Sequence, residues 1–200
     1  MIGIDHTRAG IDVRTVFSFT KKKMAEALAV LQKVPGIEGC VLISTCNRME
    51  LWASTDDGFP EEGLYEQLCK IKEADPGMYR PYFVFRKERE AVQHLFWLAG
   101  GLKSRILGED QIVTQVGEAL SFAREQYATD SVMETLFRMA VTAAKKVKTE
   151  VELSHTDNSV VRTAIDTLKE QGQTFAGKKC MVIGNGVMGK LTATMLLAEG

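Results

Sequence analysis

The stretch GCVLISTCNRMELWAST, residues 39–55, contains two short apolar runs separated by a polar segment. Each run has the length and the β-branched or aromatic content that are typical of buried strands. Cys46 stands where the first run ends, between small polar residues, and Arg48 follows two positions later. This stretch predicts two strands, with a cysteine placed at the end of the first one.

Apolar runs and helical periods alternate over the first half of the chain, and after Lys87 the apolar spacing is helical. Ser131 with Glu134, and Ser154 with Asp157, have the spacing of capping boxes at the starts of two helices. We expect strands over residues 1–6, 39–45, 49–55 and 82–85, and helices over residues 20–33, 60–73, 89–102, 109–126, 130–152 and 154–171.

These elements predict two parts. Residues 1–153 form an α+β domain, in which a small sheet with helices is followed by a helical segment. Residues 154–200 add a linking helix and a strand, glycine turn and helix, the first βα unit of an α/β Rossmann domain. A single βα unit makes no doubly wound sheet, so we expect the chain to be a fragment of a longer protein.

The composition limits the function classes. Of the 200 residues, 45% are hydrophobic and 26% are charged, and the formal net charge is −1. Such a chain has no overall basic field for nucleic acid, and none of its apolar runs approaches the ~18 residues of a membrane span. The four cysteines include no CxxC pair or metal-ligand spacing. We expect a cytoplasmic protein with free thiols, no metal and no membrane partner.

The stretch GNGVMG, Gly184 to Gly189, matches the dinucleotide-binding pattern between an apolar strand and a helix. Its glycines allow a tight turn, close approach of a pyrophosphate and close packing of the helix on the strand. The alternative is a tight turn without a ligand. The residue that reads the ribose would follow ~20 positions later, beyond Gly200, so we expect weak dinucleotide binding at most.

Other candidate residues keep two interpretations each. Cys46 is either a thiolate nucleophile or a structural thiol. His94, beside the apolar face of a helix, is either a proton carrier or a partly buried histidine with one hydrogen bond. Four polar residues either line a pocket for a small polar ligand or cap helices and lie on their solvated faces: Ser104, Glu109, Gln111 and Gln115. The basic run Lys145, Lys146 and Lys148 either contacts phosphates or forms a solvated face.

Three motifs together resemble one family. STCNRME (residues 44–50), GLKSRILGEDQIVTQV (101–116) and VIGNGVMG (182–189) follow the order and distances of glutamyl-tRNA reductases. Typical motifs of that family read STCNRxE, GLDSxxLGExQIxGQV and GAGxMG, and GLNH near the N-terminus compares with GIDH here. The resemblance covers essentially the whole chain. It departs at Lys103, Arg105 and Thr114, and at Asn185 in the glycine turn.

The resemblance implies an enzyme that uses NADPH to reduce glutamate carried on tRNA to glutamate-1-semialdehyde, in tetrapyrrole (porphyrin) biosynthesis. Cys46 would attack the ester and form a thioester, and His94 matches a functionally important histidine. The implied substrate-binding residues are Thr45, Cys46, Asn47, Arg48, Ser104, Glu109, Asp110, Gln111 and Gln115, and the implied cofactor-binding residues are Gly184, Asn185, Gly186, Val187, Met188 and Gly189.

The same resemblance implies glutamate-charged tRNA as a partner, glutamate-1-semialdehyde aminomutase as a further one, and a homodimer for the full-length protein. We expect the 200 residues to transfer or hydrolyse the acyl group but not to reduce it. Two alternatives stay open: a dinucleotide-dependent dehydrogenase of a free small molecule, with a structural Cys46, and a non-catalytic homologue that binds tRNA, a tetrapyrrole or a pathway partner.

Overall fold

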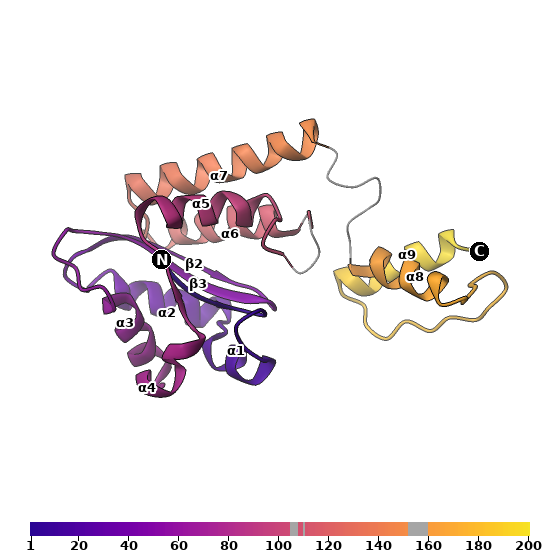
Figure 1. Cartoon of the computed structure of the whole chain (residues 1–200), viewed down its shortest axis with the longest axis horizontal. Coiled ribbons are helices and arrows are strands. Elements are labelled where there is room, and N and C mark those ends of the chain that lie inside the picture. Colours follow the sequence, from indigo (N-terminus) through magenta and orange to yellow (C-terminus); the bar gives the residue numbers. More distant parts are fainter. Residues whose placement is uncertain (105–107, 110, 152–159) are drawn as a thin grey trace.

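The computed structural model describes residues 1–104, 108–109, 111–151 and 160–200. In this part of the chain, four strands form one antiparallel sheet in the order β2-β3-β1-β4 (Figure 1). The strands are β1 (Ile2–Asp5), β2 (Ile37–Ser44), β3 (Arg48–Thr55) and β4 (Val84–Phe85). The expected strands and the α+β class of this domain are therefore confirmed.

The register of the sheet decides which side chains share a face. Asp5 of β1 lies opposite Arg48 of β3, and Gly3 lies opposite Glu50. Because successive residues of a strand point to opposite faces, Arg48, Glu50 and Trp52 share one face of β3. Met49 and Leu51 point to the other face and join a separate apolar cluster. The two faces of β3 therefore differ: one carries charged and aromatic side chains, and the other carries apolar ones.

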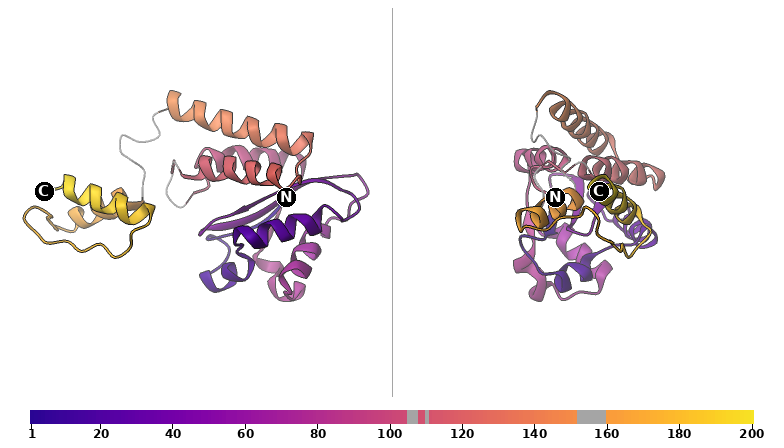
Figure 2. Two further views of the ribbon diagram at one scale, coloured as in Figure 1. Left: turned by 180° about the vertical axis from the view of Figure 1, so that it is seen from behind. Right: turned by 90° about the vertical axis from the view of Figure 1, so that its right-hand side faces the viewer.

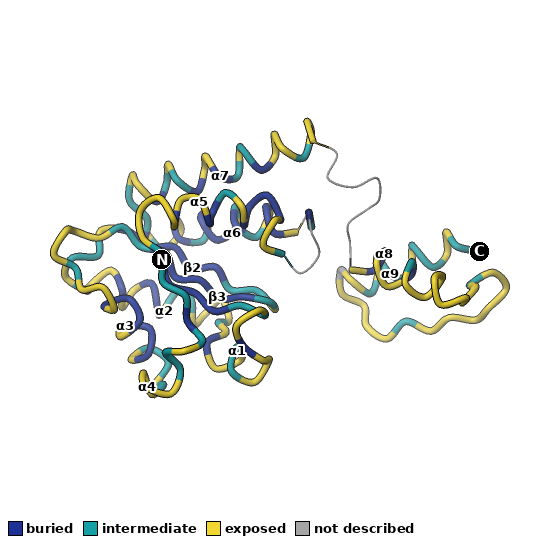
Figure 3. The backbone as a smooth tube through the Cα atoms, in the orientation of Figure 1, coloured by how far each residue is buried: buried dark blue, intermediate teal, exposed yellow. Residues whose placement is uncertain are grey.

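Helices cover both sides of the sheet (Figures 1 and 2). One side carries α1 (Ile11–Phe17), α2 (Lys21–Leu31), α3 (Gly63–Lys72) and α4 (Pro76–Tyr79), followed by a 3-10 turn (Arg80–Tyr82). The other side carries α5 (Glu88–Ala99), α6 (Gln111–Glu125) and α7 (Ser131–Glu150). Figure 3 shows β2 and β3 buried between the two layers. The short helices α1 and α4 were not expected from the sequence.

The start of α7 differs from its predicted capping box. Asp130, and not Ser131, is the N-cap, and its side chain accepts a hydrogen bond from the Met133 amide at 2.9 Å. Glu134 instead pairs with the Arg124 guanidinium of α6. Both Asp130 and Ser131 can cap a helix, so the sequence pattern alone did not distinguish them. The Ser154 and Asp157 box lies outside the described residues.

The C-terminal residues form α8 (Val160–Glu170) and α9 (Val187–Ala198), which are joined by an ion pair between Arg162 and Glu199 at 2.9 Å. The strand expected directly before the glycine turn, which would span residues 179–183, is not assigned in the structure. A strand needs a neighbour for its ladder hydrogen bonds, and no described segment pairs with these residues. No helix in the described ranges is both long and apolar enough to cross a membrane.

Candidate functional site

The link between β2 and β3 presents Cys46. The Thr45 hydroxyl oxygen accepts hydrogen bonds from the amides of Asn47 and Arg48, both at 3.2 Å. The Thr45 amide donates to the Arg48 carbonyl at 2.8 Å. These bonds fix the turn, and Cys46 at its tip has an exposed, free thiol. An exposed thiol on a fixed turn is accessible to a substrate carbonyl.

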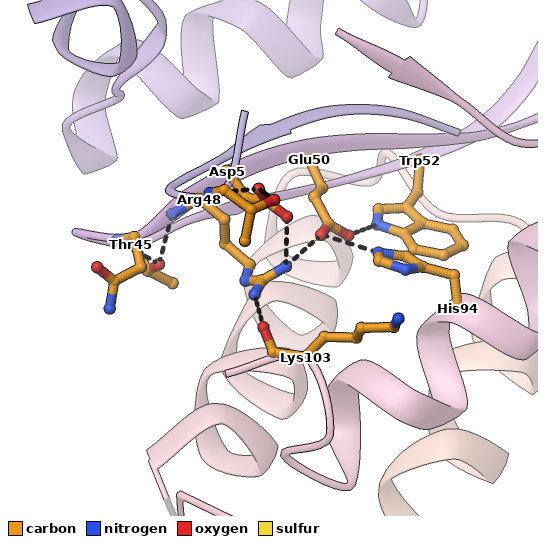
Figure 4. A network of polar contacts seen from close by, with 9 residues as sticks. Asp5, Thr45, Arg48, Glu50, Trp52, His94 and Lys103 are labelled. Atoms are coloured by element: carbon orange, nitrogen blue, oxygen red, sulfur yellow. Dashed lines mark hydrogen bonds and ion pairs between the residues drawn. The ribbon is translucent and has the colours of Figure 1, made fainter. Parts of the chain in front are cut away.

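Arg48 points from this turn into the protein and is only 3% exposed. Its Nη1 donates to Glu50 Oε1 at 2.9 Å and lies 3.9 Å from Asp5 Oδ2. Its Nη2 donates to the backbone carbonyl of Lys103 (Figure 4). The guanidinium therefore joins β3 to the segment that follows α5.

Glu50 is the centre of the network in Figure 4. Besides Arg48, its carboxylate accepts hydrogen bonds from Trp52 Nε1 at 3.1 Å and from His94 Nε2 at 3.0 Å. Burial raises the pKa of the Glu50 carboxyl, but the interactions with His94 and Arg48 outweigh burial and hold the pKa below its ordinary value. Glu50 is thus a buried carboxylate anion surrounded by donors.

His94 of α5 is also buried, at 4% exposure, and stacks on Trp52 with ring centroids 6.0 Å apart. Because Nε2 faces an acceptor, it carries the hydrogen, and a neutral ring then leaves Nδ1 as an acceptor. Nδ1 is buried and has no hydrogen-bond partner among the described residues. The histidine is held in one orientation by Glu50.

Two glycines hold the segment that contains Lys103 and Ser104. Gly108 donates its amide to the Gly101 carbonyl at 3.1 Å, and Gly101 has a φ of +79°. A Cβ on Gly101 would lie 2.9 Å from Gly108 Cα. The backbone approach that brings Lys103 to Arg48 therefore needs glycine at position 101.

We expect Gly101→Ala to destabilise the protein by at least about 1–2 kcal/mol, since the left-handed backbone is unfavourable for alanine and the clash adds to it. Denaturant unfolding measures this change. Gly10→Ala is the matched control, because Gly10 has φ −63° and open space around it. Equal stabilities for the two variants would contradict the prediction.

The structure brings Thr45 and Gln115 together. Both line a cavity of about 320 Å³ at the end of β2, between α2 and α6. Ser104 and Glu109 are half-buried, and the Glu109 carbonyl accepts a hydrogen bond from Lys148 at 3.2 Å. Lys148 of the basic run is thus a partner of a predicted substrate residue.

The remaining predicted residues are more peripheral. Gln111 is exposed, and its side chain contacts Met188 Sδ at 3.4 Å. Lys103 Nζ lies 4.8 Å from the centroid of the Trp97 ring, and Thr114 is exposed on α6. Asp110 and Arg105 lie outside the described residues.

The glycine turn has a backbone that fits a phosphate group. Gly184 has a φ of +122°, α9 begins just after Gly186, and both glycines have open space where a Cβ would stand. A Cβ on Gly189 would lie 2.1 Å from the Gly184 carbonyl oxygen. Amides at a helix N-terminus, above a turn whose glycines leave the backbone open to close approach, are what a pyrophosphate requires.

Sequence reasoning missed the roles of Glu50 and Asp5. The Asp5 carboxylate accepts hydrogen bonds from the amide and hydroxyl of Thr7 at 2.9 and 2.6 Å and lies beside Arg48. The available signal for Glu50 was a charged residue inside an apolar strand, two positions from an arginine, which places both on one face. A buried charge in such a place needs a partner.

The lowered pKa of Glu50 predicts a pH dependence of stability. A carboxyl whose folded pKa is below its unfolded value stabilises the protein above the unfolded pKa, and that contribution disappears as the pH falls through the folded value. We expect the wild type to lose more unfolding free energy than Glu50→Gln on acidification below about pH 4.3. Denaturant unfolding over a pH series tests this, and parallel curves would contradict it.

Comparison with known proteins identifies the family. Residues 2–151 match the family model described as glutamyl-tRNAGlu reductase, N-terminal domain. The glutamyl-tRNA reductase of Acetivibrio thermocellus is 45% identical over 204 residues, which cover 100% of this chain and 59% of that protein. That of Alkaliphilus oremlandii is 42% identical over 200 residues, with the same coverage of 100% and 59%.

A solved structure agrees with these sequences. The glutamyl-tRNA reductase from Methanopyrus kandleri superposes with a TM-score of 0.70 at 27% identity, covering 100% of this chain and 46% of that one. The chain therefore spans little more than half the length of the curated relatives above. By its motifs, its fold and these similarities, the chain belongs to the glutamyl-tRNA reductase family and contains that family's N-terminal domain.

Proposed function

We propose that this chain is the acyl-transfer part of a glutamyl-tRNA reductase and accepts glutamate from charged tRNA onto Cys46. The observation that carries the proposal is the exposed Cys46 thiol on a fixed turn, directly before the buried Arg48, Glu50 and His94 network. Family membership supplies the substrate and the reaction class, since the relatives carry this activity in their names.

The reaction begins with attack of the Cys46 thiolate on the ester carbonyl that links glutamate to the tRNA ribose. The new S–C bond replaces the C–O bond to the ribose, the ribose oxygen takes up a proton, and tRNA leaves. The product is a thioester, whose carbonyl is more electrophilic than the original ester. A cysteine is therefore better suited to this position than a serine.

The buried network prepares the site for a negatively charged amino acid. Arg48 is the proposed partner of the glutamate side-chain carboxylate. Its Nη2 donates to the Lys103 carbonyl, so a carboxylate that replaces this carbonyl leaves the Nη1 bond to Glu50 unchanged. Glu50 also fixes His94 through Nε2. In this proposal, Nδ1 of His94 takes up the proton of the Cys46 thiol and then donates it to the departing ribose oxygen.

Reduction belongs to the full-length enzyme. When bound, NADPH would supply the hydride for reduction of the acyl group that Cys46 carries. In this chain, the backbone of Gly184 to Gly189 would hold its pyrophosphate, as the open turn before α9 allows. Dimerisation of the full-length protein, a cytoplasmic location and transfer of the aldehyde to an aminomutase stay predictions.

The test is intact-mass spectrometry after brief mixing with glutamate-charged tRNA. We expect a transient increase by one glutamyl group that neutral hydroxylamine removes, as it does for thioesters. Tryptic mapping locates the group. If the protein stays unmodified while the tRNA remains bound and charged, or if the group resists hydroxylamine, the proposed acyl transfer is wrong.

A further inference from the structure

The cavity beside Thr45 lies at the outer edge of the sheet. Since β2 is the outermost strand, the cavity is open between α2 on one side of the sheet and α6 on the other. Its floor is formed by residues 42–45 of the β2 end. Its volume of about 320 Å³ is in the range of small-ligand sites, and it ends one residue before Cys46.

Lys21, which lines the α2 wall of this cavity, belongs to an unusual set of charges. Lys21, Lys22 and Lys23 occupy the first turn of α2, which has no acidic residue. Cations at a helix N-terminus are unfavourable, because that end of the macrodipole is already positive. No carboxylate lies within 4.0 Å of any of these ammonium groups in the described ranges. An external anion would compensate for this arrangement.

The lysines of α7 provide a contrast. Lys145 and Lys146 lie toward the C-terminal end of α7, where the dipole favours cations. Lys146 also pairs with Glu150 at 3.7 Å. The structure itself therefore accounts for this basic run, and it does not account for the α2 lysines.

An aromatic ring joins the basic wall to the turn. The Phe19 amide donates to the Ser44 hydroxyl oxygen at 3.1 Å, and its half-buried ring lines the cavity. Lys72 Nζ lies over this ring, 3.7 Å from its centroid. Burial, together with the charge of Lys23, lowers the pKa of Lys72 to about 8. An aromatic ring in a basic surrounding is typical of platforms for single-stranded nucleic acid.

The opposite wall has a different chemistry. Gln115, Glu118, Ser121 and Glu125 of α6 line it. The two carboxylates disfavour phosphates on this side, but they accept hydrogen bonds from hydroxyl and amino groups, which a ribose and a base provide. The cavity thus has a basic residue, Lys21, on its α2 side and two carboxylates, Glu118 and Glu125, on its α6 side.

We propose that this cavity binds the terminal nucleoside of the tRNA acceptor end, with the preceding phosphates along Lys21, Lys23 and Lys72. The inference rests on the proposed acyl transfer, which requires the terminal ribose ester to reach Cys46. The single-stranded end then leaves through the nearest open surface. That surface is the edge groove between α2 and α6.

The experiment measures the affinity of the chain for uncharged tRNA specific for glutamate over a salt series. The test variant is Lys21→Gln/Lys23→Gln, and the matched control is Lys145→Gln/Lys146→Gln, another pair of exposed helix lysines. The slope of log affinity against log salt changes by about 0.7 for each single-strand phosphate contact that is lost. We expect a slope smaller by about 1 to 1.5 for the α2 variant and an unchanged slope for the α7 variant.

Phe19 is tested separately, because its substitution also alters packing. Phe19→Leu keeps an apolar side chain but loses the stacking face, and we expect at least about fivefold weaker tRNA binding. Phe19→Tyr should restore it. Melting curves of both variants identify any loss that is due to unfolding.

The outcomes separate this proposal from the acyl transfer. If the α2 variant binds tRNA as the wild type does, if only the α7 variant is weakened, or if the wild type does not bind, the groove proposal is overturned. Weaker binding by the α2 variant alone, with no glutamyl adduct on the wild type, would keep the groove and reject the chemistry. A glutamyl adduct on the wild type, together with unchanged tRNA binding by the α2 variant, would support the acyl transfer and reject the groove.

Discussion

The Cys46→Ala variant is expected to form no glutamyl adduct, because the carbon of the ester has no other sulfur to bond with at the turn. The remaining thiols are either buried, as Cys40 and Cys69 are, or distant in sequence, as Cys180 is. Burial, reinforced by the charge of Asp130, raises the pKa of Cys40 to about 12, so this thiol stays protonated. The adduct should fall below detection by intact-mass spectrometry.

Cys180→Ala is the matched control for this experiment. Cys180 is the other exposed cysteine among the described residues, and its removal should leave the adduct unchanged. An adduct that persists in Cys46→Ala, or that disappears in Cys180→Ala, would move the nucleophile elsewhere. Unchanged melting curves for both variants exclude unfolding as the cause, since an alanine fits either exposed position.

The second large effect is expected for Glu50→Ala. This change leaves the Arg48 guanidinium, which is 3% exposed, without its buried counter-charge. Removal of one partner from a buried ion pair typically lowers the free energy of unfolding by about 3–5 kcal/mol. Trp52 and His94 also lose their shared acceptor. Denaturant unfolding should therefore show a much lower midpoint.

Two further variants test whether burial of the ion pair causes the large loss of stability that is expected for Glu50→Ala. Glu62→Ala removes an exposed carboxylate from its pair with Arg80, which has a length of 2.7 Å, and it should have a far smaller effect, since water screens the remaining charge. Glu50→Gln keeps the shape and loses the charge. It should retain more stability than Glu50→Ala while it still slows adduct formation. Similar stabilities for Glu50→Ala and Glu62→Ala would contradict the buried pair.

The strands and most helices were predictable because their signals are local. Apolar runs such as residues 39–45 and helical periods such as residues 130–152 contain their own evidence. The strand expected over residues 179–183 depends instead on partners, and no described segment pairs with it. A local sequence pattern cannot predict a strand whose hydrogen-bond partners lie in another segment of the chain.

The candidate site also combines features that a local sequence pattern reveals with features that depend on distant residues. The motif around Cys46 could be found in the sequence, and the structure adds that this thiol is exposed. The bond from Arg48 to the Lys103 carbonyl and the bond from His94 to Glu50 join residues that are 55 and 44 positions apart. No spacing rule within one strand or helix reveals such contacts, so the central place of Glu50 required the tertiary structure.

The contact between Arg48 and residue 103 uses a main-chain carbonyl and not a side chain. Position 103 can therefore carry any side chain that the backbone there accepts, including one of opposite charge, without loss of this contact. Lysine in place of the family's usual aspartate is one example, with its ammonium directed to the Trp97 ring. A substitution at position 103 can therefore change the charge near Arg48 and leave the hydrogen bond from Arg48 to the main-chain carbonyl in place.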